Sequence, residues 1–432
     1  MESEVLCANF NQDASSLSVS TRKGYALYAI HSLDDFQKMH EAESEEVCSI
    51  ERLFSSSLVT TVSLKAPRKL KVSHFQKGTE ICSHSYSNAV LAVKLNRLRV
   101  IICLEECLYV HNIRDMRVLH TIRDTPRNQR GLCDLSAADN SLLAYPGSSS
   151  AGQLHVFDAA NLQSLTTIHA HEGALACVRF DADGKKVATA SDKGTVIRVF
   201  SLPDSERLFE FRRGVKRCVT IYSLAFSADS AFLACSSNTE TVHVFKLDAQ
   251  NAVAASATRQ QEATNSDEDE TASAASTAAA SSSLSGWMDY ATKMAQPYLP
   301  AQVSDMLHQD RAYAVAKLPT VGHRTRVAIV TLKQKPRLLV ASLDGYLYMY
   351  TIEPNECGLV KQHRFLNSPV AQTPAGPAPA APTGQSYAKA VHQDSSSQKE
   401  AASSSERQRV NETEKLRLDD SQEFPPMTHS AD

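Results

Sequence analysis

The 432-residue chain lacks the signals that mark enzymes, metal proteins and membrane spans. No run approaches the roughly 18 to 20 apolar residues that a membrane span needs. The ten cysteines contain no C-x-x-C pair and the 15 histidines show no ligand spacing, so we expect no metal, and reduced cysteines rather than disulfides. G-x-S-x-G, P-loop, H-E-x-x-H and glycine-rich dinucleotide motifs are also missing, and we therefore expect neither a cofactor nor enzymatic activity.

Neither sign of charge predominates in the chain. The net charge is −3, which gives no reason to expect binding to nucleic acid and restricts any anion recognition to a local patch. Met1 to Asn11 carries Glu2 and Glu4 instead of a basic segment followed by an apolar one, which argues against a secretory signal. We expect a cytoplasmic monomer.

A repeat of 40 to 45 residues decides the fold class. Phe157, Phe200 and Phe245 stand at equivalent points of successive repeats, 43 and 45 residues apart. Each repeat consists of short apolar runs that are separated by turns such as Asp183-Gly184. Similar segments begin at Cys133, Gly173, Ile221 and Arg326. Four short strands in such a period are typical of a β-propeller.

The length fits seven blades. Residues 5 to 365 without the atypical segment 249–311 give about 43 residues per blade. We therefore predict an all-β, seven-bladed β-propeller of WD-like repeats within residues 1–366. A first blade around Ala8 to Ile30 and a second around Leu58 to Ser83 have no clean repeat. The W-D dipeptide of WD repeats is absent, so their usual polar network is not expected.

Two regions have a different composition. Residues 249–311 are rich in Ala, Ser, Thr and acidic residues, and residues 367–432 are rich in Pro, Ala, Ser and charge. Neither buries enough apolar surface to order itself, so we predict a disordered insertion and a disordered tail. Because Ala312–Leu318 fits a missing fourth strand, the insertion is placed between the third and fourth strands of the sixth blade.

Paired arginines end the fourth strand of the fifth blade. Successive side chains of a strand point to opposite faces, so Arg212 and Arg213 are expected to face different neighbours. Arginine matches phosphate geometrically and retains its charge, which suits two phosphate sites. The alternative is an exposed strand end with solvated charge.

These residues carry a resemblance to a known family. Phe211-Arg212-Arg213-Gly214 at the end of the fifth blade resembles the L/F-R-R-G motif of the PROPPINs, and phrases such as ATASDKGTVIRVFSL and PRLLVASLDGYLYMY extend the similarity over residues 5 to 365. The resemblance implies binding of phosphatidylinositol 3-phosphate and phosphatidylinositol 3,5-bisphosphate at two rim sites. It further implies a scaffold in autophagosome formation, peripheral on phagophore, preautophagosomal and endosomal membranes. The alternative is a WD-like propeller scaffold that binds only proteins.

The resemblance also assigns residues to the two sites. The first site comprises His171, Thr189, Ser191, Gly194, Thr195, Arg198 and Arg212. The second comprises Arg213, Gly214, Ser237, Thr239, Thr241 and His243. Hydroxyls and backbone N–H groups would bind phosphate oxygens, and arginine would supply the charge. In the competing interpretation these residues stabilise local turns and strands.

Within the insertion, residues 284–307 form a candidate membrane-inserting segment. Trp287, Ala291, Met294 and Tyr298 recur at steps of four, three and four, which is helical spacing. An apolar side with Trp287, Met294 and Tyr298 suits a membrane interface, and the resemblance implies insertion of this loop. Packing of the segment against the propeller is the alternative.

A basic cluster lies in the third blade. It comprises Arg97, Arg99, Arg114 and the nearby Arg117. These residues are candidates to line a groove with the second blade and receive an acidic peptide, or else ordinary solvated strand ends. The resemblance associates them with recruitment of autophagy proteins of the lipid-conjugation machinery.

Overall fold

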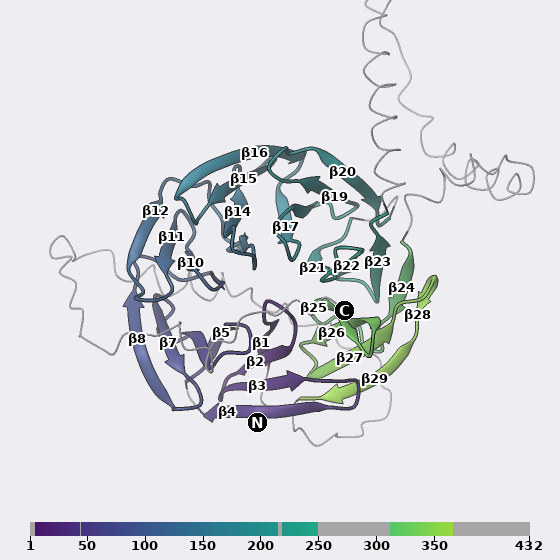
Figure 1. Cartoon of the computed structure of the whole chain (residues 1–432), viewed down its shortest axis with the longest axis horizontal. Helices are drawn as coiled ribbons and strands as arrows, with labels where there is room; N and C mark the ends of the chain where they lie inside the picture. Colours follow the sequence, from purple (N-terminus) through teal and green to yellow (C-terminus); the bar gives the residue numbers. More distant parts are fainter. Residues whose placement is uncertain (1–4, 44, 215–217, 249–311, 366–432) are drawn as a thin grey trace, which may run out of the picture.

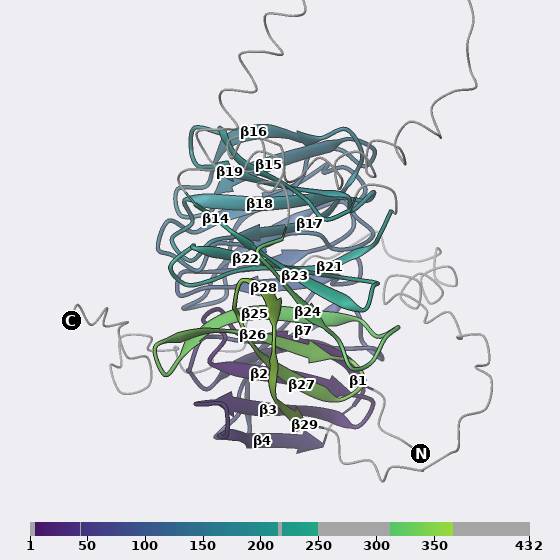
Figure 2. The ribbon, with the colours of Figure 1, turned by 90° about the vertical axis from the view of Figure 1, so that its right-hand side faces the viewer.

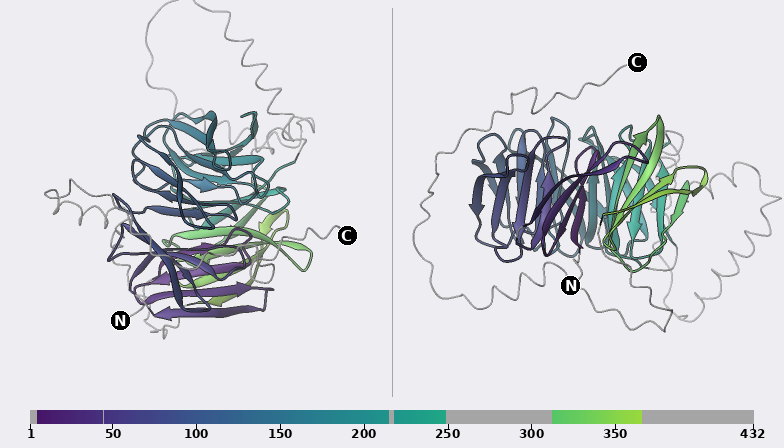
Figure 3. Two further views of the ribbon diagram at one scale, coloured as in Figure 1. Left: turned by 60° about the vertical axis from the view of Figure 1, so that its left-hand side comes forward. Right: turned by 90° about the horizontal axis from the view of Figure 1, so that it is seen from below.

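The computed structural model describes residues 5–43, 45–214, 218–248 and 312–365. These residues form seven sheets that surround a common axis, and the sheets follow one another around the ring in chain order (Figure 1). The prediction of a seven-bladed β-propeller is confirmed. Seen from the side, the ring is a disc whose strands run roughly along the axis (Figure 3, right).

The first three blades are each built from four consecutive antiparallel strands. The first blade comprises β1 (Val5–Phe10), β2 (Ser16–Thr21), β3 (Gly24–Ile30) and β4 (Phe36–Glu43). The second comprises β5 (Val47–Arg52), β6 (Leu58–Ser63), β7 (Lys69–His74) and β8 (Thr79–Ser85). The third comprises β9 (Ala92–Leu95), β10 (Arg99–Cys103), β11 (Leu108–Asn112) and β12 (Val118–Ile122). The first two blades thus extend beyond both ends of the segments that the sequence suggested.

The fourth and fifth blades repeat this order. The fourth comprises β13 (Asp134–Leu135), β14 (Leu142–Pro146), β15 (Gly152–Asp158) and β16 (Gln163–His171). The fifth comprises β17 (Leu175–Phe180), β18 (Lys186–Ser191), β19 (Val196–Ser201) and β20 (Arg207–Arg212).

The last two blades are linked by an additional strand. The sixth comprises β21 (Ile221–Phe226), β22 (Phe232–Ser237), β23 (Thr241–Lys246) and β24 (Ala314–Lys317). The seventh comprises β25 (Thr325–Leu332), β26 (Lys335–Ser342), β27 (Tyr346–Thr351) and β29 (Leu359–Arg364). Between the last two strands, β28 (Asn355–Cys357) returns to the sixth blade and pairs in parallel with β24, beside which it lies in Figure 2.

Burial follows the position of a strand in its blade. The second strands β14 and β18 are almost entirely buried, because each sheet is covered on both faces by its neighbours. The outermost strand β4 has no fully buried residue and is mostly exposed. The equivalence of Phe157, Phe200 and Phe245 is confirmed, since they lie in the third strands β15, β19 and β23.

The ring closes between the first and the last blade without exchange of a strand. β1 to β4 come entirely from the N-terminal part of the chain and β29 from the C-terminal part. The Tyr28 hydroxyl donates to the Phe365 carbonyl over 2.8 Å, and both residues share one buried core with Leu339 and Met349. Lys361 pairs with Asp34 over 2.8 Å at the outer edge. Side-chain packing therefore closes the ring.

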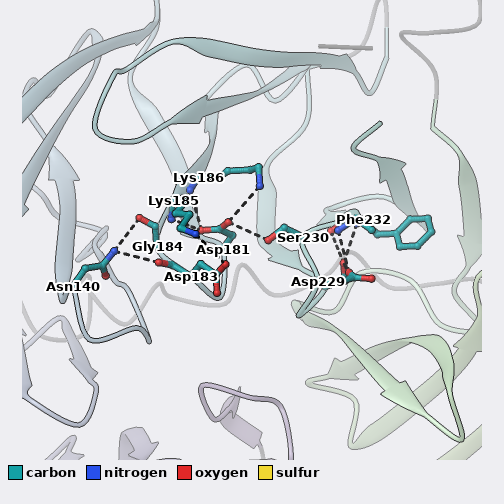
Figure 4. A network of polar contacts seen from close by, with 11 residues as sticks. Asn140, Asp181, Asp183, Gly184, Lys185, Lys186, Asp229, Ser230 and Phe232 are labelled. Atoms are coloured by element: carbon teal, nitrogen blue, oxygen red, sulfur yellow. Dashed lines mark hydrogen bonds and ion pairs between the residues drawn. The ribbon is translucent and has the colours of Figure 1, made fainter. Parts of the chain in front are cut away.

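Polar side chains in the turns between the first and second strands join neighbouring blades. Asn11 donates to the Phe54 carbonyl over 2.9 Å, and Asn96 donates to the Ser136 carbonyl over 2.8 Å. Figure 4 shows the continuation of this turn belt through the fourth, fifth and sixth blades. There Asn140 donates to the carbonyls of Asp183 and Gly184, and the Ser230 hydroxyl donates to Asp181. The belt links blades that lack the W-D network.

The insertion occupies the predicted place in the chain. It leaves after β23 and returns at β24, whose position within Ala312–Leu318 matches the fourth strand expected from sequence. The disorder predicted for 249–311 and 367–432 lies outside the described residues. Within the described ranges, no helix has the length and apolar character needed to cross a membrane.

We expect Asn96→Ala to destabilise the ring. Asn96 is buried, and its amide donates to Ser136 and to Ser141 while its oxygen accepts the N–H groups of Leu98 and Arg99. The lost bonds leave buried groups unpaired, so the free energy of unfolding should fall by about 3 kcal/mol in urea denaturation.

The matched control is Asn161→Ala. Asn161 is exposed and its amide bonds only Asp158 of its own turn, so we expect a loss below about 1 kcal/mol. Equal losses in the two variants would contradict a structural role for the turn belt.

Candidate functional site

The candidate site flanks the outer part of the fifth blade on both sides. Phe209 and Phe211 of β20 point toward the sixth blade, where Phe211 stacks on Phe245 with ring centroids 4.7 Å apart. Arg213 has the same parity and contacts Thr239 of the sixth blade. Arg212 has the opposite parity, is exposed, and lies across from Val196 of β19. The two arginines therefore face different clusters.

The first cluster lies between the fourth and fifth blades. The His171 Nε2 atom, at the end of β16, lies 3.0 Å from the Thr189 hydroxyl, and that hydroxyl donates to the Arg198 carbonyl over 3.4 Å. Arg198 also donates from Nη1 to the Ala170 carbonyl over 2.6 Å. The structure thus brings together His171, Thr189 and Arg198.

A carboxylate that the sequence analysis did not assign belongs to the first cluster. Glu210 lies opposite Arg198 in the β19–β20 pair and accepts its Nε over 2.8 Å. The same carboxylate oxygen accepts Arg207 Nη1 over 2.9 Å. Cross-strand pairing of the two outer strands was the signal that would have found Glu210. Arg198 is thus paired with Glu210, whereas Arg212 is exposed at the end of β20.

The turn between β18 and β19 frames the same side. Ser191 is buried and its carbonyl accepts the Gly194 N–H over 3.0 Å. Gly194 has a φ of 62° and packs so closely that a Cβ would overlap the Val219 carbonyl oxygen. The Thr195 carbonyl accepts the Arg213 N–H over 2.9 Å. The turn therefore fixes the backbone from which the arginine pair projects.

The second cluster lies between the fifth and sixth blades. The Arg213 guanidinium donates to the Thr239 hydroxyl. The Ser237 and Thr239 hydroxyls lie 3.0 Å apart, and the Thr241 hydroxyl lies 3.3 Å from His243 Nε2. All six second-site residues are near β22, β23 or the end of β20, with Gly214 next to Arg213 in open surroundings. The hydroxyls of Ser237, Thr239 and Thr241 thus lie next to one another beside the Arg213 guanidinium.

Both clusters contain a histidine that folding keeps neutral. Burial lowers the pKa of His171 and of His243 from 6.5 to about 4, and the charges of Arg198 and Arg213 respectively lower it further. The resulting stabilisation is fully present above pH 6.5 and is lost as the pH falls toward 4, because the unfolded chain then binds more protons. A neutral imidazole leaves the arginines as the cations of each cluster.

The third-blade arginines do not form one patch. The Arg97 guanidinium lies over the Phe54 ring of the second blade, 4.0 Å from its centroid. Arg99 turns the other way and donates to the carbonyls of Ala159 and Ala160 of the fourth blade, over 2.7 and 3.0 Å. Arg114 is exposed, as is Arg117. Trp287, Met294 and Tyr298 lie outside the described residues.

These features define the class of the molecule: a seven-bladed propeller whose fifth blade bears a basic, hydroxyl-rich cluster on each flank. Comparison with protein families gives the particular assignment. The PROPPIN family model matches residues 4–366, and the chain belongs to that family.

Curated relatives agree with this assignment. WD repeat domain phosphoinositide-interacting protein 2 of Mus musculus is 52% identical over 366 residues, which cover 84% of this chain and 77% of the relative. WD repeat domain phosphoinositide-interacting protein 1 of Homo sapiens is 48% identical, covering 85% and 78%. Autophagy-related protein 18 of Caenorhabditis elegans is 42% identical, covering 82% and 84%.

Solved structures share the architecture. The structure named "Complex of KlAtg21 with coiled-coil of AgAtg16" matches with a TM-score of 0.63 and 26% identity, covering 84% of this chain and 99% of the other. Kluyveromyces lactis Hsv2 matches with a TM-score of 0.61 and 20% identity, over 84% and 99%, which supports the fold alone.

Two glycines of the candidate site differ sharply in their tolerance of a side chain. Gly194→Ala would strain a positive φ and press against Val219, so we expect the free energy of unfolding to fall by more than about 2 kcal/mol. At Gly214 a Cβ meets no heavy atom within 4 Å, so Gly214→Ala should change it by less than about 0.5 kcal/mol. Equilibrium denaturation of both variants measures the difference. Similar stabilities would show that the turn before β19 is not fixed by this close contact.

Proposed function

We propose that the protein binds phosphatidylinositol 3-phosphate and phosphatidylinositol 3,5-bisphosphate at the two clusters and acts as a membrane-recruited scaffold in autophagosome formation. The divergence of Arg212 and Arg213 toward two hydroxyl-rich clusters is the observation that carries the proposal. The relatives named phosphoinositide-interacting and autophagy-related supply the lipid class and the process. It works as a non-enzymatic monomer, cytoplasmic and peripheral on phagophore, preautophagosomal and endosomal membranes.

The chemistry of each cluster suits a phosphate monoester. In the second cluster, Arg213 provides fixed charge while Ser237 and Thr239 provide hydroxyl donors. In the first, Arg212 provides the charge, and the neutral His171 and Thr189 offer further hydrogen bonds. A phosphate beside either histidine favours its protonated form and so raises its pKa. Proton uptake would then accompany lipid binding.

The position of the clusters on the ring fits a membrane-bound disc. Both flank the outermost strand of one blade, so both reach the same sector of the rim. The insertion departs from the adjacent sixth blade after β23. We place the membrane against this sector, with Trp287, Met294 and Tyr298 of segment 284–307 inserted into the bilayer. Charge and apolar burial then act on one surface and reinforce each other.

Protein partners are assigned to a different sector. The structural relative named as a complex with a coiled coil of Atg16 supports recruitment of autophagy proteins of the lipid-conjugation machinery. Arg97, Arg99 and Arg114 of the third blade are the proposed residues of the site for an acidic partner. Arg97 and Arg114 would meet it directly, while Arg99 donates to Ala159 and Ala160 and would hold the blade edge in place. A scaffold that binds only proteins is the alternative function.

The first test removes the paired arginines. Arg212→Ala or Arg213→Ala alone should weaken flotation with vesicles carrying phosphatidylinositol 3-phosphate about tenfold, and the double variant should abolish it. The reason is that a single change removes the arginine from one cluster while the other cluster keeps its own. Circular dichroism confirms that the fold survives.

Two control variants separate charge loss from site loss. Lys333→Ala with Lys335→Ala removes two positive charges from an exposed turn of the seventh blade and should leave flotation unchanged. Arg97→Glu with Arg114→Glu should float normally and lose partner recruitment. Flotation of the Arg212 and Arg213 double variant at the parental level would favour the protein-only scaffold.

The second test uses the only tryptophan of the chain. Burial of Trp287 in a bilayer would contribute a few kcal/mol, at about 25 cal/mol per Å² over roughly 150 to 250 Å². Its emission should shift to the blue when vesicles bearing the 3-phosphate lipid are added. Trp287→Ala with Met294→Ser should lower flotation while binding of soluble head group stays normal. An unshifted spectrum together with undiminished flotation would place the segment away from the bilayer.

A further inference from the structure

The fourth strand of the sixth blade ends in an exposed lysine that belongs to neither candidate cluster so far. Lys317 is the last residue of β24, which lies next to β23 toward the outside of the ring (Figure 1). It pairs with Thr241, the first residue of β23, in a regular antiparallel register. Directly paired residues project from the same face of a sheet, with Cβ atoms about 4.5 to 5.5 Å apart. Lys317 therefore lies beside a hydroxyl of the second cluster.

Strand alternation shows which neighbouring blade the lysine faces. Val242 pairs with Ala316, and both pack in the buried core that the sixth blade shares with the seventh. Thr241 and Lys317 are each one residue away, so their side chains leave the opposite face of the sheet. Phe245, which has the same parity as Thr241, packs in the core shared with the fifth blade. Lys317 thus faces the fifth blade and the second cluster.

The position of Lys317 in the sixth blade is that of Arg212 in the fifth. Arg212 lies opposite the first residue of β19, and Lys317 lies opposite the first residue of β23. The residue after Arg212 donates its backbone N–H to the Thr195 carbonyl over 2.9 Å, and the residue after Lys317 donates to the Glu240 carbonyl over 2.8 Å. The two cations therefore end equivalent strands in the same way.

The backbone of this lysine is held while its side chain stays exposed. The Tyr350 hydroxyl of the seventh blade donates to the Lys317 carbonyl over 2.9 Å. β28 pairs with the outer edge of β24, so β24 is not a free edge. Among the described residues, the Lys317 ammonium forms no ion pair, not even with Glu356 of β28, which pairs opposite Val315. Its charge is therefore not cancelled by a neighbouring carboxylate.

The two clusters differ in one further equivalent position. In the fifth blade, Glu210 lies opposite Arg198 and forms an ion pair with it over 2.8 Å. The corresponding residue of the sixth blade is Val315, which lies opposite His243. The second cluster thus has an apolar residue at the place where the first cluster has a carboxylate. An anion in the second cluster would meet no negative charge from this position.

Two cations from different blades flank the hydroxyls of the second cluster. Arg213 donates to the Thr239 hydroxyl, which lies 3.4 Å from the Thr241 hydroxyl, and Thr241 is the neighbour of Lys317. We propose that Lys317 is a further binding residue of the second cluster, and that with Arg213 it makes this cluster the one that takes a head group with two ring phosphates. The inference rests on the proposed lipid-binding function. One phosphate would pair with the guanidinium and the other with the ammonium.

The test titrates the second cluster by itself. Full-length Arg212→Gln protein, in which the first cluster has lost its exposed arginine, is titrated calorimetrically with soluble short-chain phosphatidylinositol 3,5-bisphosphate and 3-phosphate. Adding Lys317→Gln should weaken binding of the bisphosphate at least about tenfold, because a charge-assisted hydrogen bond is lost. Binding of the monophosphate should weaken less than about threefold. Lys317→Arg keeps the charge and should retain the affinity for the bisphosphate.

The matched control is Lys335→Gln in the same background, which removes an exposed charge from β26 of the seventh blade and should leave both affinities unchanged. Unchanged bisphosphate binding by the Lys317→Gln protein would overturn this inference alone. An equal loss for both lipids would overturn the assignment of the second phosphate to Lys317. Binding of neither lipid by the Arg212→Gln protein would instead overturn the proposed lipid site itself, and this inference with it.

Discussion

The structure depends on the mutual covering of adjacent blades. A four-stranded sheet buries both faces only when a neighbour lies on each side, so the ring is stable only when it is closed. Here the closing contact is made by side chains, with Tyr28 bonded to the Phe365 carbonyl over a shared core. Each other junction has its own buried cluster, such as the stack of Phe211 on Phe245 between the fifth and sixth blades. These buried clusters fix the blades relative to one another and thereby position the residues at the rim.

The rim clusters show how packing directs the side chains of the candidate site. Phe209 and Phe211 fill the core toward the sixth blade, and strand alternation then sends Arg213 the same way and Arg212 the other way. The orientation of the arginines is therefore set by two buried phenylalanines rather than by contacts among the arginines themselves. The same alternation places Glu210 beside Arg198, which neutralises one cation and leaves Arg212 exposed.

Local periodicity was sufficient to predict the blades but not the contacts between them. The spacing of Phe157, Phe200 and Phe245 identifies the third strands, and the place of the insertion follows from the missing fourth strand. The turn belt and the partners of Arg99 join residues that are 40 to 61 positions apart. Such pairings have no local pattern, because they arise only when the ring closes.

A chain with little net charge can still have strongly basic surface regions, because some cations form ion pairs with carboxylates and others do not. Arg198, Arg179 and Lys94 each lie against a carboxylate, so their charges are largely cancelled where they stand. At the rim, by contrast, Arg212 is exposed and is followed directly by Arg213. An anion gains more at such places than at an isolated surface arginine, since it interacts with several charges and removes their repulsion. Local imbalance rather than net charge is therefore the basis of the phosphate recognition that we propose.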